Sequence, residues 1–278
     1  MKKVYKIVLI IFLSLISNSL FGFTSLPQDS SQTSEPLYDS KVQLTFGLFL
    51  SSINSTAQLN TNTGNFGTII NLETAFKLPD ARNLFRLNGL YRFNNMHSVE
   101  GYYYALNRSG SSVTLDSLIF GDLTININSS VDAFFNATLF GTKYRYSVHN
   151  DESVEAGFSA GLSFLDISVG LAVQLLNQEK SDEYNDLLFL PVIGFFNRIN
   201  ITDNLIFRSN VDMFALDIER YDGVLFDFGL SLEYLFLQRF ALGISYNAYT
   251  LDVQFDAKES GRLIYSHKGL MFFGKVFL

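Results

Sequence analysis

The stretch that decides the fold is VLFDFGLSLEYLFLQRFALGISYNAY, residues 224–249. Bulky apolar and aromatic residues occupy every second position on both sides of Gln238-Arg239. Small, polar or charged residues, among them Asp227 and Ser245, occupy the positions between them. A repeat of two residues is that of a β-strand, and the short interruption predicts a tight hairpin.

Two environments could accept such a hairpin. In a soluble protein the bulky face would be covered by a second layer, whereas a membrane barrel turns it outward into lipid and keeps the polar face in its lumen. Here the bulky face is long and rich in Phe and Tyr, which favours lipid. We therefore predict an all-β protein, an antiparallel transmembrane β-barrel built from repeats of this hairpin.

The composition agrees with this fold class. Hydrophobic residues make up 47% of the 278 residues, yet after the N-terminal stretch there is no apolar run long enough for a membrane helix. The net charge is -7 without a basic cluster, so the chain has no electrostatic footprint for nucleic acid. Without Cys it can be neither a lipoprotein nor a disulfide-stabilised domain.

The N-terminal residues predict export. A basic start, an apolar core and small residues describe a signal peptide over residues 1–24. The alternative is a single membrane anchor, which the short apolar run disfavours. Residues 25–40 are polar, contain Pro27 and Pro36, and predict a disordered periplasmic tail. The barrel domain is then expected over residues 41–278.

Ten strands are expected, with eight to twelve as the range. Short turns at 94–97, 149–152, 201–204 and 238–239 alternate with longer polar connections, which predicts periplasmic and extracellular ends. One of these connections is 174–186. Two strand-like segments, 66–77 and 113–128, are interpreted as extensions or hairpins of extracellular loops. The expected strands are 41–56, 82–94, 97–109, 131–148, 153–172, 187–200, 204–217, 224–237, 239–255 and 263–278.

Two positions interrupt this strand pattern. The alternation slips near Leu165-Asp166, where a β-bulge would account for the change of face. Pro191 is unusual inside a strand, because proline cannot donate to the sheet.

The last strand alternates up to the final residues Phe277 and Leu278. This pattern resembles the C-terminal signal for barrel insertion, although Phe is one place early. Together with the segments 89–97 and 102–110, the chain resembles small Gram-negative outer-membrane β-barrel proteins of the OmpA-like and OmpW-like group, in an uncharacterised branch. The resemblance implies an outer-membrane location, contact with outer-membrane lipid, and recognition of the last strand by the barrel-insertion machinery. It implies no catalytic residue.

The alternation also predicts which charged residues face the lumen. Six cations and five anions nearly cancel, as expected for a narrow lumen in which charges must be paired. We predict an ion-pair network with Arg92 and Arg145 near the periplasmic end and Asp227 and Glu233 among their partners. The alternative is scattered charges in water. The eleven residues are Arg86, Arg92, Glu100, Lys143, Arg145, Glu155, Arg208, Asp212, Asp227, Glu233 and Lys275.

Little in the sequence predicts catalysis. His97 and His149 fall in predicted turns, and there is no His or Cys cluster, so neither a metal nor a cofactor is expected. His267 and Ser266 are adjacent on a strand and face opposite sides. An outer-rim site would need His267 with Glu259 or Asp256.

Three functions follow in order of preference. The first is a non-enzymatic outer-membrane protein, structural or a narrow passage for small solutes. The second is a binding or adhesion barrel acting through long extracellular loops. The third is a lipid-modifying enzyme using His267.

Overall fold

The structure is a computed structural model that describes residues 40–175, 178–218, 221–237, 239–256 and 260–278. The predicted signal peptide, 1–24, lies outside the described residues. So does the predicted tail, 25–40, except for its last residue. All statements below concern the described residues.

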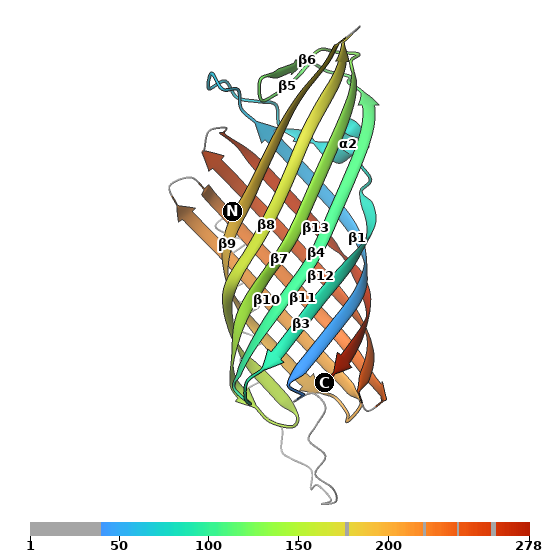
Figure 1. The fold of residues 1–278 in the computed structure, drawn as a ribbon, viewed down its shortest axis with the longest axis vertical. Coiled ribbons are helices and arrows are strands. Elements are labelled where there is room, and N and C mark those ends of the chain that lie inside the picture. Colours follow the sequence, from blue (N-terminus) through green and yellow to red (C-terminus); the bar gives the residue numbers. More distant parts are fainter. Residues whose placement is uncertain (1–39, 176–177, 219–220, 238, 257–259) are drawn as a thin grey trace, which may run out of the picture. The chain divides into compact units, whose positions relative to one another are not determined.

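Ten long antiparallel strands close into a barrel (Figure 1). Closure comes from pairing of the first and last strands, in register from Gln43 opposite Phe277 to Leu59 opposite Gly261. The predicted fold class and strand number are therefore confirmed. The strands are β1 (Val42–Leu59), β3 (Ala81–Arg92), β4 (His97–Val113), β7 (Ser130–Asn150), β8 (Val154–Leu175), β9 (Gln178–Asn200), β10 (Leu205–Ile218), β11 (Tyr221–Leu237), β12 (Phe240–Asp256) and β13 (Ser260–Phe277).

The polarity of the two faces inverts partway along the strands, and β12 shows this inversion clearly. Near the short turns its outward side chains are apolar and its inward ones polar. Toward the other end the outward side chains are polar and the inward ones apolar and buried. From the short turns upward, the outward residues are Leu242, Ile244, Tyr246, Ala248, Thr250, Asp252 and Gln254, and the inward ones Ser245, Asn247, Tyr249, Leu251, Val253 and Phe255.

This inversion locates the membrane. An apolar outer face with a polar lumen is the pattern of a barrel wall in lipid. A polar outer face around an apolar interior is the pattern of a protein in water. Because the short turns mark the periplasmic end, the periplasmic half spans the membrane and the extracellular half stands above it. The extracellular half is held by an ordinary hydrophobic core, with Phe135, Leu165 and Tyr265 each fully buried.

The inversion also corrects the predicted β-bulge near Leu165-Asp166. β7 and β8 pair without interruption through this region, and their register shift lies between Ser147 and His149. Leu165 changes the apparent pattern because, from this height upward, the apolar residues of β8 face inward. The change in apolar face is real, but the backbone stays regular.

The predicted loop over 174–186 is also wrong, because β8 ends at Leu175 and β9 begins at Gln178, and these two residues are paired. Tyr184 shows why this segment is ordered as strand: its ring stacks on Phe255 with centroids 4.3 Å apart. Pro191 lies where β9 is paired with β8 but no longer with β10, since that ladder ends at Ile193. An unpaired sheet edge tolerates proline.

Two loops cover the extracellular half (Figure 1). Residues 66–77 contain a short strand β2 (Ile70–Asn71) and a helix α2 (Leu72–Phe76), so the strand-like prediction was largely wrong there. Asn71 caps the helix through the backbone N–H of Thr74. Residues 113–128 contain a hairpin of β5 (Leu118–Phe120) and β6 (Leu123–Ile125), the extracellular hairpin expected for this segment.

Leu72 and Phe76 of α2 are fully buried in the hydrophobic core. The first loop therefore plugs the extracellular half from within, where α2 packs against the inward faces of β1 and β4. No helix among the described residues is long and apolar enough to cross a membrane.

Candidate functional site

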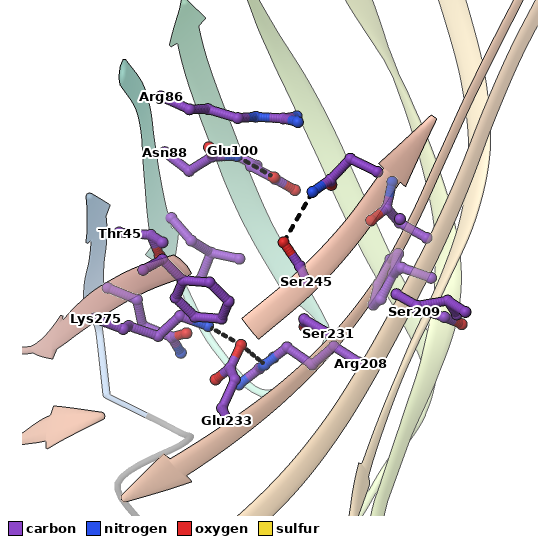
Figure 2. Close-up of a pocket in the computed structure, with 18 of the residues that line it drawn as sticks. Thr45, Arg86, Asn88, Glu100, Arg208, Ser209, Ser231, Glu233, Ser245 and Lys275 are labelled. Atoms are coloured by element: carbon purple, nitrogen blue, oxygen red, sulfur yellow. Dashed lines mark hydrogen bonds and ion pairs between the residues drawn. The ribbon is translucent and has the colours of Figure 1, made fainter. Parts of the chain in front are cut away.

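A polar cavity of about 140 Å³ lies in the lumen of the membrane-spanning half (Figure 2). Its walls are inward side chains of strands from around the barrel, many of them small and polar, such as Thr45, Ser231 and Ser245. It reaches close to the periplasmic end, because Gln43 and Lys275 line it and lie within two residues of the ends of β1 and β13.

Eight charged side chains line this cavity. The cations outnumber the carboxylates by five to three, a net charge of +2 in a chain of net charge -7. The cations are Arg86, Lys143, Arg145, Arg208 and Lys275, and the carboxylates are Glu100, Asp212 and Glu233.

Two clusters of ion pairs account for most of these charges. On one side, Glu100 accepts from Arg145 at 2.9 Å and lies 3.9 Å from Lys143, whose Nζ donates to Asp212 at 2.7 Å. Ser159 also donates to Asp212, at 3.1 Å.

On the other side, Glu233 pairs with Arg208 at 3.1 Å and with Lys275 (Figure 2). Each carboxylate of the wall is therefore already neutralised by at least one cation.

A third cluster lies nearer the periplasmic turns and is almost completely excluded from solvent. Arg92 makes two hydrogen bonds to Glu155, both at 3.0 Å, and Arg198 approaches the same carboxylate at 3.4 Å. Their side chains are between 0% and 3% exposed. The hydroxyl of Ser147 donates to Glu155 at 2.6 Å. A buried carboxylate with this many donors is fully compensated.

All eleven predicted lumen residues lie on the inward face, but the predicted partners differ. Arg92 pairs with Glu155 and Arg145 with Glu100, and neither pairs with Asp227 or Glu233. Among the described residues no ion pair involves Asp227, which lies opposite Asp212 across β10 and β11.

The sequence analysis did not include Arg198 among the lumen residues, although it lies on the same inward face of β9 as Phe196, two residues away. Adding it gives seven lumen cations against five carboxylates, so the predicted near-balance is an excess of two positive charges.

An aromatic cluster around His267 separates the polar cavity from the core above it. The imidazole is 3% exposed and is stacked on Tyr249 with centroids 5.1 Å apart. Phe49 and Tyr104 meet it edge-on, and its Nδ1 lies 3.1 Å from the hydroxyl of Tyr265. Burial of this kind is typical of a structural histidine.

The predicted outer-rim site at His267 is therefore not assembled. Because His267 is buried in the lumen, it cannot present an imidazole to a substrate at the rim. Ser266 is on the opposite face of β13, where its hydroxyl contacts the carbonyl of Asn54. Glu259 and the side chain of Asp256 lie outside the described residues.

A further polar cluster, which the sequence did not indicate, holds the first loop in the core. Glu73 of α2 accepts from Arg108 of β4 at 2.5 Å and from the backbone and hydroxyl of Ser55 at 2.9 and 2.8 Å. Arg108 also donates to Ser55 at 2.7 Å and to the carbonyl of Pro79 at 3.2 Å. These bonds hold the plugging helix against two barrel strands.

The remaining histidines lie at the periplasmic turns, as expected. His149 is exposed and pairs with Asp151 at 2.8 Å, and His97 contacts the hydroxyl of Tyr144. Partial burial raises the pKa of Asp151, but hydrogen bonds from the backbone N–H groups of Val154 and Ser153 outweigh it and lower the pKa below 3.8. No group of three or more His, Cys, Asp or Glu residues in the described part of the chain could hold a metal ion.

Comparison with known proteins identifies the fold and nothing finer. No protein-family model and no curated protein sequence match this chain. The outer membrane protease OmpT from Escherichia coli is similar in structure, with 9% identity and a TM-score of 0.57, over 89% of this chain and 99% of OmpT.

Two further barrel structures are similar to this chain at lower TM-scores. They are the Pseudomonas putida toluene transporter TodX (6% identity, TM-score 0.32, 90% of this chain and 95% of TodX) and the Yersinia pestis attachment invasion locus protein Ail (10%, 0.30, 83% and 99%).

At these identities the likeness concerns the fold alone. Membership of the OmpA-like and OmpW-like group stays a prediction. The closed antiparallel topology, the lipid-facing apolar wall and the likeness to OmpT together make this chain a small ten-stranded outer-membrane β-barrel.

Proposed function

We propose that this protein is a non-conducting, non-enzymatic outer-membrane barrel that holds a rigid structured platform at the cell surface. The observation that carries this proposal is the hydrophobic core of the extracellular half. A polar solute entering from outside would have to pass this packed core, which includes Leu72 and Phe76 of the plugging helix. This arrangement favours the structural role over the narrow passage.

The core is continuous across the lumen. Its contributors come from strands on all sides of the barrel, and Tyr184 of β9 meets Phe255 of β12 across the interior. Barrels of this size have interiors that side chains can fill. Beneath the core, the aromatic rings around His267 add a second barrier above the polar cavity.

We place the protein in the outer membrane of a Gram-negative bacterium, exported with a cleaved signal peptide. Its partners would be outer-membrane lipid along the apolar wall and the barrel-insertion machinery at β13. Support comes from the lipid-facing side chains, with Leu242 58% and Phe272 51% exposed on neighbouring strands.

Planar-bilayer recordings test the proposal. The refolded wild-type protein should show almost no steady conductance, measured beside an open porin in the same lipid. A variant that shortens three core side chains, Phe135→Ala, Leu251→Ala and Tyr265→Ala, should leak or lose its fold. Large, steady conductance from the folded wild-type barrel would contradict the proposal.

A second function, binding or adhesion through the extracellular loops, is favoured by one specific observation. Phe66 is 82% exposed, Leu115 81% and Ile69 64%, all in the loops of the extracellular end. Large apolar side chains this exposed suggest a contact surface. Replacing Phe66 and Leu115 by Ser should leave the barrel folded but reduce attachment of cells displaying it to a hydrophobic surface. Unchanged attachment would rule out this role for the two residues.

A further inference from the structure

One cation of the lumen cavity, Arg86, belongs to none of the ion-pair clusters described above. Arg86 of β3 lines the cavity and makes no ion pair with any described carboxylate, and its Nε has no hydrogen-bond acceptor. Its described contact is the ring of Tyr104, 5.8 Å from the guanidinium carbon. Figure 2 shows the side chain extending over the cavity. We propose that this cavity binds a small oxyanion and that Arg86 is its principal ligand.

The charges of the wall support an anionic occupant. The three carboxylates that line the cavity are already engaged by other cations, so none is free to neutralise Arg86. Asp227 is opposite Asp212 on the inward face and interacts electrostatically with Arg86, but it makes no ion pair with it and does not line the cavity. Counting it still leaves an excess of one positive charge. An uncompensated charge is costly where water is limited, so the site would be stabilised by an anion.

The donors around the cavity suit an oxyanion better than a simple ion. A guanidinium presents parallel N–H groups that match two oxygens of one carboxylate, phosphate or sulfate. Nη2 of Arg208 also has no acceptor. On β12 the amide of Asn247 donates to Ser245 at 2.8 Å and keeps one N–H for a ligand.

The volume is sufficient for a small oxyanion. Since one water needs about 10–15 Å³ of a cavity measured in this way, the cavity of about 140 Å³ has room for inorganic phosphate, sulfate or a short carboxylate. The extracellular half is filled, and the lining reaches Gln43 and Lys275 near the periplasmic end, so the ligand would enter from the periplasm.

The experiment compares anions on the refolded barrel in detergent at matched ionic strength. Inorganic phosphate, sulfate and acetate should each raise the thermal unfolding midpoint saturably, and chloride should not. Titration calorimetry then gives the dissociation constants. Arg86→Gln should weaken binding about tenfold or more, because it removes a charge-assisted pair. The control, Arg82→Gln, changes an exposed arginine on the same strand and should leave binding unchanged.

Two more variants keep the test decisive. If Arg86→Gln does not fold, Arg86→Lys can replace it, because lysine keeps the positive charge but lacks the parallel N–H groups of the guanidinium. Arg86→Lys should raise the dissociation constant for sulfate while lowering the unfolding midpoint only slightly. Asp227→Asn removes the nearest competing carboxylate and should tighten oxyanion binding.

Absence of saturable binding by the wild type would overturn the proposal, and so would equal stabilisation by chloride. Asp227 would instead be the true partner of Arg86 if Asp227→Asn destabilised the barrel without tightening binding, and that result too would overturn it.

Discussion

The inversion of polarity along β12 makes a prediction that four substitutions can test. An outward charge should be costly in the membrane half and cheap above it, whereas an inward charge should be cheap in the membrane half and costly above it. The outward pair is Ile244→Arg and Thr250→Arg, and the inward pair is Ser245→Asp and Leu251→Asp. All four positions lie within eight residues of one strand, so differences in local backbone are small.

The magnitudes follow from the surroundings of each side chain. Ile244 is 39% exposed between Leu242 and Tyr246 on the lipid-facing wall, and an arginine there should cost about 2–4 kcal/mol. Thr250 is exposed above that wall, so the same change should cost about 0.5 kcal/mol or less.

The inward pair should show the opposite order. Leu251 is fully buried in the core, and a carboxylate there loses apolar burial and lies unpaired, at a cost of about 5 kcal/mol or more. Ser245 lines the cavity with its excess of cations, so Ser245→Asp should change stability by about 1 kcal/mol at most.

Reversible urea unfolding in lipid vesicles measures these free energies. Because the chain has no Trp, β-sheet circular dichroism is a suitable signal, with heat-dependent gel migration as the check for folded barrel. If Thr250→Arg cost as much as Ile244→Arg, the extracellular half would be in lipid and the assignment of the two halves would be refuted. A tolerated Leu251→Asp would refute the hydrophobic core.

Three further predictions concern separate sites. Glu155→Gln leaves two buried arginines without their counter-ion and should cost about 3–5 kcal/mol, whereas His149→Gln in an exposed turn pair should change unfolding by less than about 0.5 kcal/mol; equal costs would contradict the buried cluster. Because the folded pKa of Asp151 is lowered below 3.8, its ionised form stabilises the fold fully above that value. The stability difference between wild type and Asp151→Asn should therefore be constant at neutral pH and shrink as pH falls below 3.8, and a pH-independent difference would contradict the turn hydrogen bonds. A Cβ on Gly110 would lie 2.5 Å from a carbonyl of the plugging helix, but one on Gly101 of the same strand meets nothing closer than 3.8 Å. Gly110→Ala should thus cost about 1–3 kcal/mol and speed proteolysis of the first loop, and Gly101→Ala should do neither.

The fold could be predicted from the sequence because the repeat of two residues holds over most of each barrel strand, interrupted among the described residues only near strand ends such as Ser147–His149 and Leu235–Leu237. The hairpin over 224–249 became β11 and β12 with the expected alternation. The height at which the apolar face moves inward was not recognised, since a period-two pattern is the same whichever side is apolar. The one indication in the sequence is at Leu165, where the apolar positions move from one face of the strand to the other, a change that also fits a β-bulge. A regular strand that passes from lipid into water produces the same change.

The lumen site was partly readable for a similar reason. The alternation of residues along each strand is enough to place Arg92 and Glu155 on the inward face. It does not show that they pair, because they lie on β3 and β8, which are not neighbours in the sheet. Which charges meet across a lumen depends on strand tilt and on side-chain length. The cluster of Glu73, Arg108 and Ser55 was beyond reach, since it depends on how a loop folds back into the barrel.

The two halves of the barrel are stabilised by different forces, and each half determines what its interior can contain. In the membrane half the outer wall is apolar, so transfer to lipid favours it and the lumen is free to hold charges, provided that they are paired. Above the membrane the outer wall must be polar, and stability then has to come from apolar burial inside. A continuous water-filled passage would remove that burial from the extracellular half. For strands that rise this far above lipid with so little structure outside them, a filled extracellular lumen is therefore a condition of folding. The polar cavity can persist in the membrane half because the lipid-facing wall already stabilises that part of the chain.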